Sequence, residues 1–130
     1  MNSALKTSSF AKMIVHAKKI PLRTNGRQVL LPIQNVEHIQ AARNYSVIYG
    51  TNGKSWVASK TLQDFNELLD PFNQFLRLHR SYLVNTALIV DCFYENERFT
   101  VLLSNQKKLH VSRRYVKAVR SALMIRANCA

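Results

Sequence analysis

Three arginines stand where the sequence could bind an anion. Arg80 follows His79 at the end of the strand-like run 75–79, while Arg113 and Arg114 are adjacent. A guanidinium group donates two parallel hydrogen bonds, which fit a phosphate or the O6 and N7 atoms of guanine. An arginine that directly follows a buried strand is anchored and still reaches solvent. These residues predict a surface that binds phosphates or base edges.

The charge of the chain fits a polyanionic partner. Nineteen Lys and Arg residues stand against seven Asp and Glu, giving a net charge of +12 and a pI near 10.2. Residues 71–130 hold ten of the basic residues and three of the acidic ones, and residues 1–20 hold four basic residues and no acid. Residues 21–70 are nearly balanced. The charge favours duplex DNA, RNA or an anionic lipid surface as partner.

The residue types that commonly carry catalysis or bind metals form no pattern. The four histidines, His16, His38, His79 and His110, are scattered, with no two of them four residues apart. The chain has three glycines, too few for a glycine-rich phosphate loop. Cys92 and Cys129 form no motif, and we expect both to be reduced thiols. We therefore expect no enzyme, no metal site and no cofactor.

The length of 130 residues fits one domain. No apolar run approaches the roughly 20 residues of a membrane span, and the apolar stretch at 13–15 is too short for a signal peptide. We expect a cytoplasmic protein without membrane contact. Residues 1–17 show no clear periodicity and predict an N-terminal arm or short helix, ahead of a domain over 18–124 and a tail over 125–130.

Short strands and tight turns follow from residue 18 onward. Asn25-Gly26 and Asn52-Gly53 each lie between strand-like runs, and such pairs favour type I′ hairpin turns because both central residues need a positive φ. Further turns are predicted at 95–97 and at Asn105-Gln106. Four hairpin-like joins in about ninety residues predict an antiparallel, mainly β fold.

Two short helices interrupt the strands. Leu62, Phe65, Leu68 and Leu69 have helical spacing, and Thr61 with Asp64 resembles a capping box ahead of them. The second predicted helix runs from Ser112, a good N-cap, to about Leu123. Its first turn holds Arg113 and Arg114, although the positive end of the helix dipole disfavours cations there. Either both side chains point into water, or they face a phosphate or a base.

Residues 75–85, Phe-Leu-Arg-Leu-His-Arg-Ser-Tyr-Leu-Val-Asn, resemble the signature of the LytTR domain, F-x-R-x-H-R-S-Y/F-I/L-V-N. Three further pieces lie in the family's order: Ile39-Gln40-Ala41 before Asn44-Tyr45, Ser59-Lys60-Thr61-Leu62 at a strand-to-helix entry, and the closing Val111-Ser112-Arg113. Gln40 stands where the family usually has Glu. The resemblance covers about residues 18–123.

The resemblance implies an elongated β-β-β architecture of antiparallel strands with two short helices, acting in bacterial transcription regulation. LytTR domains place loops in successive major grooves of duplex DNA, commonly in pairs on direct repeats, which implies a homodimer on repeated sites. Most follow a receiver domain or membrane segment. Only about seventeen residues precede the domain here, so we expect a response-regulator-family domain that stands alone. A separate signalling protein is one partner that could supply its input, and how the chain is switched stays open.

The positions matched in the family place three loops on DNA. Arg80 and Arg114 are the predicted base readers, with Asn44 and Ser46 at the first loop. Phosphate binding or loop positioning is predicted for Arg43, Lys60, Arg77, His79, Lys107, Lys108, Ser112, Arg113 and Lys117. For His79 we favour an orienting hydrogen bond that holds the Arg80 loop.

Two other classes of function remain open on the sequence. The chain could be an RNA-binding or ribosome-associated basic β protein, although it lacks a row of aromatic residues on one sheet face. It could also be a protein-interaction adaptor whose basic face docks on an acidic partner. Binding to duplex DNA is the leading interpretation.

Overall fold

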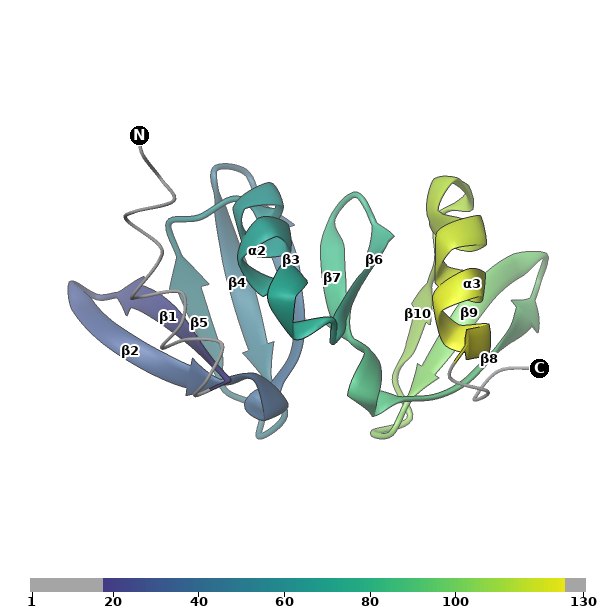
Figure 1. The fold of residues 1–130 in the computed structure, drawn as a ribbon, viewed down its shortest axis with the longest axis horizontal. Helices are drawn as coiled ribbons and strands as arrows, with labels where there is room; N and C mark the ends of the chain where they lie inside the picture. Colours follow the sequence, from purple (N-terminus) through teal and green to yellow (C-terminus); the bar gives the residue numbers. More distant parts are fainter. Residues whose placement is uncertain (1–17, 126–130) are drawn as a thin grey trace.

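The computed structural model describes residues 18–125, which form three antiparallel sheets set side by side along the long axis of the molecule (Figure 1). A two-stranded sheet contains β1 (Lys19–Thr24) and β2 (Arg27–Pro32). A five-stranded sheet has the order β5-β4-β3-β7-β6 and contains β3 (Val36–Ala42), β4 (Tyr45–Gly50), β5 (Ser55–Ala58), β6 (Phe75–His79) and β7 (Tyr82–Asn85). A three-stranded sheet has the order β10-β9-β8 and contains β8 (Ile89–Glu95), β9 (Arg98–Leu103) and β10 (Lys108–His110).

Two short α-helices accompany the sheets, α2 (Leu62–Leu69) and α3 (Val116–Ile125). Single turns of 3-10 helix lie at η1 (Ile33–Asn35), η2 (Asp70–Phe72), η3 (Thr86–Leu88) and η4 (Arg113–Tyr115). The predicted mainly β fold with two short helices is confirmed. The arm or helix predicted over 1–17 lies outside the described residues, and of the predicted tail only Ile125 is described, as the last residue of α3.

The two Asn-Gly hairpins differ in their turns. Asn25 and Gly26 both have positive φ, 53° and 74°, and Thr24 pairs with Arg27, as a two-residue type I′ turn requires. At the β4–β5 turn only Gly53 has a positive φ, 87°, and the loop runs over 51–54. The side chain of Asn52 accepts a hydrogen bond from the amide of Lys54 instead. The hairpin was predicted correctly, but its type I′ turn was wrong.

The helix starts also differ from each other. Thr61 and Asp64 form the predicted capping box, in which each side chain accepts a hydrogen bond from the other residue's backbone amide. The C-terminal helix does not begin at Ser112: η4 comes first, and the Ser112 side chain makes no capping hydrogen bond. The prediction that Ser112 caps α3 is therefore wrong. The backbone carbonyl of Ser112 accepts from the amide of Tyr115 and closes the 3-10 turn.

Two separate apolar cores lie on either side of the β6–β7 hairpin. The first is formed by residues of β1 to β5 together with α2, whose Phe65 and Leu69 are buried in it. The second is formed by residues of β8 to β10 and α3, including Val119 and Leu123. On β7, Leu83 belongs to the first core and the next residue, Val84, belongs to the second. Because neighbouring side chains of a strand point to opposite faces, β7 is buried on both.

Asn85 fixes the far end of this hairpin. Its side chain is buried, and its amide nitrogen donates to the carbonyl oxygens of Val36 (2.9 Å) and Ile33 (3.3 Å). Its amide oxygen accepts from the backbone of Ala87 (3.0 Å) and from Gln74 (3.2 Å). All the polar atoms of the buried amide are therefore paired, which a buried polar group needs in order not to destabilise the fold.

A buried carboxylate joins the two halves of the molecule. Glu37 on β3 is 3% exposed, and it accepts hydrogen bonds from Lys107 Nζ (2.9 Å) and from Asn105, both in the β9–β10 turn. Its other contact is His38 Nδ1, at 2.8 Å. Burial raises the pKa of Glu37, but the hydrogen bonds from Lys107 and His38 together bring this pKa below its usual value. The ionised carboxylate is therefore the form that the fold stabilises.

We expect Glu37→Gln to lower the free energy of unfolding at pH 7 by about 1–3 kcal/mol, because the charged hydrogen bond to Lys107 is lost. Since the pKa of Glu37 in the fold lies below its ordinary value of 4.5, the contribution of the ionised carboxylate to stability is complete above that pH and disappears as the pH falls through the folded pKa. The difference between wild type and variant should therefore shrink below about pH 4.5. Urea unfolding between pH 3 and pH 8 measures it, and a difference that stays constant over this range would contradict the assignment.

Candidate nucleic-acid interface

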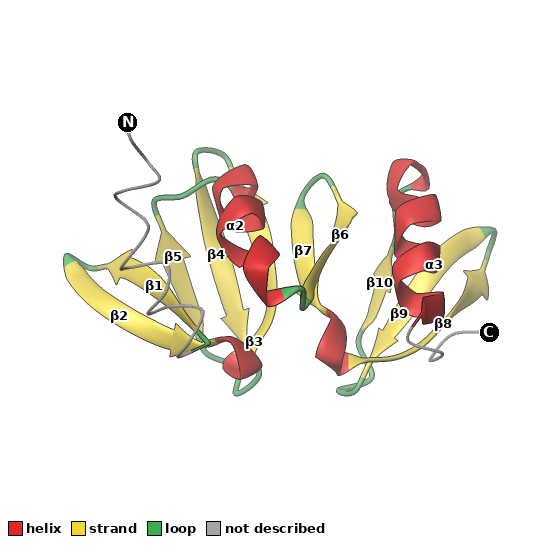
Figure 2. Cartoon of the chain, viewed as in Figure 1, coloured by secondary structure: helices red, strands yellow, loops and turns green. Residues whose placement is uncertain are grey.

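Four segments that carry predicted site residues reach the same long edge of the molecule (Figure 2). They are the β3–β4 turn with Arg43-Asn44, the start of α2 after Lys60, the β6–β7 turn with Arg80-Ser81, and Ser112–Arg114 between β10 and α3. We call these segments the interface edge. The β4–β5 and β9–β10 turns lie at the opposite edge (Figure 2).

Hydrogen bonds tie the segments of the interface edge to one another. The amide of Ala41, at the end of β3, donates to the carbonyl of Ser81 at 2.7 Å. The amide of Ser112 donates to the carbonyl of Leu78 on β6 at 2.9 Å. The hydroxyl of Tyr82 donates to the carbonyl of His110 at 2.6 Å, and burial raises the pKa of this phenol, which keeps it neutral. These hydrogen bonds thus fix the spacing of the β3–β4 turn, the β6–β7 turn and the Ser112–Arg114 segment.

The Arg80 turn has a fixed backbone and a free side chain. Arg77 donates from Nε to the carbonyl of His79 (2.9 Å) and from Nη2 to the carbonyl of Arg80 (2.8 Å). The amide of Ser81 donates to His79 Nδ1 at 3.1 Å, which confirms the predicted orienting hydrogen bond. The guanidinium of Arg80 is exposed and makes no hydrogen bond or ion pair with any described residue. It is therefore available to a ligand.

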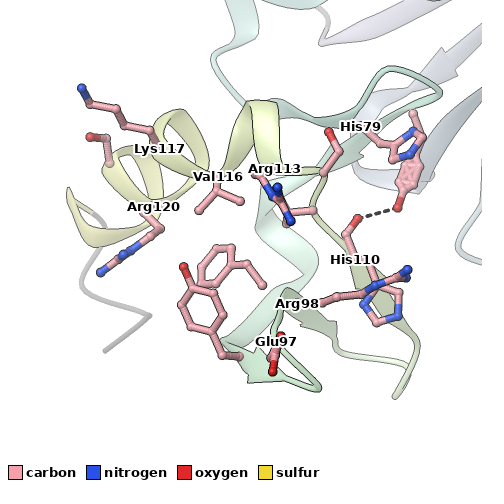
Figure 3. A pocket seen from close by; sticks show the side chains of 14 residues that line it. His79, Glu97, Arg98, His110, Arg113, Val116, Lys117 and Arg120 are labelled. Atoms are coloured by element: carbon pink, nitrogen blue, oxygen red, sulfur yellow. Dashed lines mark hydrogen bonds between the residues drawn. The ribbon is translucent and has the colours of Figure 1, made fainter.

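The two arginines of η4 point to different places. The guanidinium of Arg114 lies 5.7 Å from the ring centre of Tyr115, and that of Arg77 lies 5.9 Å from the same ring. Because Arg77 also holds the backbone of the Arg80 turn, the Tyr115 ring lies between that turn and Arg114. Arg113 instead lines a groove beside α3 (Figure 3). No acidic residue lies in η4 or the first turn of α3 to offset these charges.

The β3–β4 turn exposes Arg43 and Asn44 but not Ser46. Arg43 has a φ of 61°, a conformation that costs a residue with a side chain about 1–2 kcal/mol. Ser46 is 0% exposed, and its hydroxyl donates to the carbonyl of Lys60 at 2.7 Å. A fully buried hydroxyl cannot reach a base edge. The structure therefore gives Ser46 the role of joining the β3–β4 turn to the segment before α2.

Two predicted phosphate ligands are not brought to the interface edge. Lys107 belongs to the β9–β10 turn at the opposite edge, where its ammonium pairs with Glu37. Lys108 pairs with Glu95 at 2.9 Å and lies 5.8 Å from the ring centre of Phe93. Both lysines are thus neutralised by acids of this chain. Lys60, by contrast, is exposed and unpaired in the described part of the chain.

A groove of about 1010 Å³ opens between α3 and the β8–β9 turn (Figure 3). Predicted site residues His79, Ser112, Arg113 and Lys117 line it, together with two arginines that the sequence analysis did not single out, Arg98 and Arg120. Arg120 carried a signal in the sequence, since positions 113, 117 and 120 are spaced to lie on one side of a helix. Arg98 carried none, because it comes from a different strand.

Residues 18–125 also bear on the expectations for metal sites, membrane-spanning helices and the cysteines. In this part of the chain no group of three or more His, Cys, Asp or Glu residues is placed to hold a metal ion. None of its helices is long and apolar enough to cross a membrane. Cys92 on β8 is disulfide-bonded, so the expectation of a reduced thiol is wrong for this residue. Cys129 lies outside the described residues.

The described residues form an elongated β domain with unpaired cations along the interface edge, an arrangement that suits an extended polyanion. The model of the LytTr DNA-binding domain matches residues 26–124, and the chain therefore belongs to the LytTR family of DNA-binding domains. The matched segment begins inside the first hairpin, although Ile20 and Leu22 of β1 are already buried in the first core.

Known relatives agree with this assignment. The chain is similar to the transcriptional regulatory protein LytR of Staphylococcus aureus strain N315, with 27% identity over 107 residues, and to an uncharacterised response regulatory protein of Vibrio cholerae, with 34% over 106. These alignments cover 82% and 81% of this chain but 43% of each relative, so the chain spans less than half of their length. Its fold is similar to the solved LytTr DNA-binding domain of a Bacillus cereus protein, with a TM-score of 0.68 at 25% identity, over 82% of this chain and 96% of that one.

We expect Arg43→Gly and Arg43→Ala to separate stability from binding. Glycine adopts a positive φ without strain, so Arg43→Gly should raise the free energy of unfolding by about 0.5–1 kcal/mol over Arg43→Ala. Both variants lack the guanidinium and should lose the same affinity for duplex DNA. Urea unfolding and fluorescence anisotropy provide the two measurements. Wild-type affinity in either variant would show that Arg43 does not contact DNA.

Proposed function

We propose that this chain binds duplex DNA sequence-specifically in bacterial transcription regulation, with the turns of the interface edge in successive major grooves. The family is one of DNA-binding domains, and the S. aureus relative is named as a transcriptional regulatory protein. The observation that carries the proposal is the Arg80 turn. Its backbone is held by Arg77 and His79, while its guanidinium is free. A rigid turn loses little conformational entropy on binding, which favours both affinity and specificity.

The residues of the interface edge divide by what they would contact. Arg80 and Arg114 would read guanine, and Asn44 would read adenine, because each pairing forms two parallel hydrogen bonds with one base. Arg43, Lys60, Arg113 and Lys117 would bind phosphates, which fix the register of the protein on the duplex without reading sequence. Arg77, His79 and Ser112 position the Arg80 and Arg114 segments. Lys107 and Lys108 are left out of the proposal because acids of this chain already neutralise them.

Two chains are proposed to bind side by side on direct repeats as a homodimer, with a separate signalling protein supplying the input. Selection of bound sequences from a random duplex library tests this arrangement. Recovery of one motif repeated at a fixed spacing supports it, and recovery of single motifs would favour a monomer. Recovery of no motif at all would contradict sequence-specific binding. A competition between duplex DNA and single-stranded RNA then tests the RNA-binding alternative. An adaptor whose basic face docks on an acidic protein would bind neither nucleic acid at moderate salt.

Arg80→Ala and Lys60→Ala should weaken binding in different ways. Loss of a bidentate arginine–guanine pair should reduce the preference for the selected site over random DNA by about 1–3 kcal/mol. Loss of one phosphate contact should weaken binding to both duplexes by the same factor and reduce the slope of log affinity against log salt by about 0.9. Fluorescence anisotropy on both duplexes at several salt concentrations gives the affinity of each variant for the selected site and for random DNA, the ratio of the two affinities and the salt slope.

Lys54→Ala is the matched control for these two variants. Lys54 is exposed and unpaired in the described structure, but it lies in the β4–β5 turn at the opposite edge (Figure 2). Its replacement removes the same charge and should leave affinity, preference and salt slope almost unchanged. If Arg80→Ala weakened binding to the selected and random duplexes equally, Arg80 would be a phosphate ligand and its base-reading role would be lost.

A further inference from the structure

The groove beside α3 combines a cationic rim with an aromatic floor. Arg113 of η4 and Lys117 and Arg120 of α3 line it, and so does Arg98, the first residue of β9, whose side chain extends toward His110 (Figure 3). Tyr94 and Phe99, whose rings lie 5.2 Å apart, also line it, and Tyr94 is 59% exposed. Glu97 is the one acidic residue among its lining residues.

The cations of the groove have no acidic partner. Arg98, Arg113, Lys117 and Arg120 are all exposed, and none forms an ion pair within residues 18–125. Lys107 and Lys108, which lie away from the interface edge, differ, since both are paired with glutamates. Four uncompensated cations around one groove repel one another, and an anion with several negative charges would relieve that repulsion.

The groove continues the interface edge. Ser112 and Arg113 belong to both, and His79 directly precedes the β6–β7 turn, so a ligand along the edge passes directly into the groove. The β8–β9 turn lies beyond α3 at the end of the molecule (Figure 1). A duplex that meets the β3–β4 turn, the β6–β7 turn and η4 in order would therefore reach the groove lined by Arg98 and Arg120 last.

We propose that this groove holds the sugar-phosphate backbone of the bound duplex just beyond the segment read by Arg80 and Arg114, with Arg98 and Arg120 as phosphate ligands. The inference rests on the proposed function and extends its footprint. The guanidinium groups supply the phosphate contacts, and the exposed face of Tyr94 offers an apolar surface to the adjacent deoxyribose. The contacts are independent of sequence and set the register of the protein on DNA.

Duplex length tests this proposal with the full chain. The selected motif is prepared in a short duplex that ends at the motif and in duplexes extended at either end by about five base pairs, half a helical turn. Wild type should bind one of the extended duplexes more tightly than the short one. Arg98→Ala and Arg120→Ala should each weaken binding to that extended duplex by up to about eightfold at 0.1 M salt and reduce its salt slope by about 0.9.

The double variant, Arg98→Ala with Arg120→Ala, should bind the short and the extended duplex equally well. Lys54→Ala serves as the control that keeps the wild-type length effect, and circular dichroism checks that each variant is folded. Wild-type affinity and an unchanged length effect in the double variant would overturn the groove while leaving the proposed function intact. Failure of the wild type to bind any duplex would overturn both.

A free anion is the other source of the same phosphate chemistry. Titration with a mononucleotide, followed by NMR shifts of Arg98 and Arg120, shows whether the groove takes small phosphates alone. Mononucleotide binding together with no dependence on duplex length would assign the groove to a small ligand and overturn the DNA contact. A length effect that disappears in the double variant supports the proposal.

Discussion

Strand β7 has no solvent-facing side, and the positions of the functional segments depend on this constraint. Leu83 is part of one core and Val84 is part of the other, so a slip by one residue would put each side chain in the wrong core. Because both cores oppose such a slip, the register of the β6–β7 hairpin is fixed more firmly than that of a strand buried on one face. Arg80 lies in the turn of this hairpin and inherits that rigidity, although it is exposed itself.

Hydrogen bonds hold the β3–β4 turn, the β6–β7 turn and the Ser112–Arg114 segment in fixed positions relative to β7. The bonds from Ala41 to Ser81 and from Ser112 to Leu78 connect the β6–β7 hairpin to its neighbours on the interface edge. At the opposite edge Glu37 reaches across to Lys107 and Asn105 of the other half. Since two edges of the same junction are tied, a hinge motion between the two halves would have to break the hydrogen bonds from Ser112 to Leu78 and from Lys107 and Asn105 to Glu37, whose buried carboxylate is costly to leave unpaired.

Local patterns in the sequence predicted local structure well and missed contacts between distant residues. The hairpins, the capping box at Thr61 and the hydrogen bond from Ser81 to His79 each depend on a few neighbouring residues. The pairing of Lys107 with Glu37 joins residues seventy positions apart, and no local sequence pattern predicts it. The burial of Ser46 was accessible in principle: it is two residues from the buried Ile48, so strand alternation puts both on the inward face. Ser46 was instead predicted to face DNA, because its segment resembles a DNA-facing loop of the family.

Paired and unpaired cations are distributed unevenly over the second half of the molecule. Glu95 pairs with Lys108 within the second half of the molecule, and Glu37 on β3 pairs with Lys107 across the junction, whereas Arg113 and Arg114 in η4 form no ion pair with a described residue. A net charge of +12 spread evenly would attract DNA in any orientation. Under the proposed function, the pairing of these two lysines away from the interface edge weakens some of those orientations and favours the approach in which Arg80 and Arg114 meet the duplex. In that proposal, charge would favour one orientation of the duplex before any base is read.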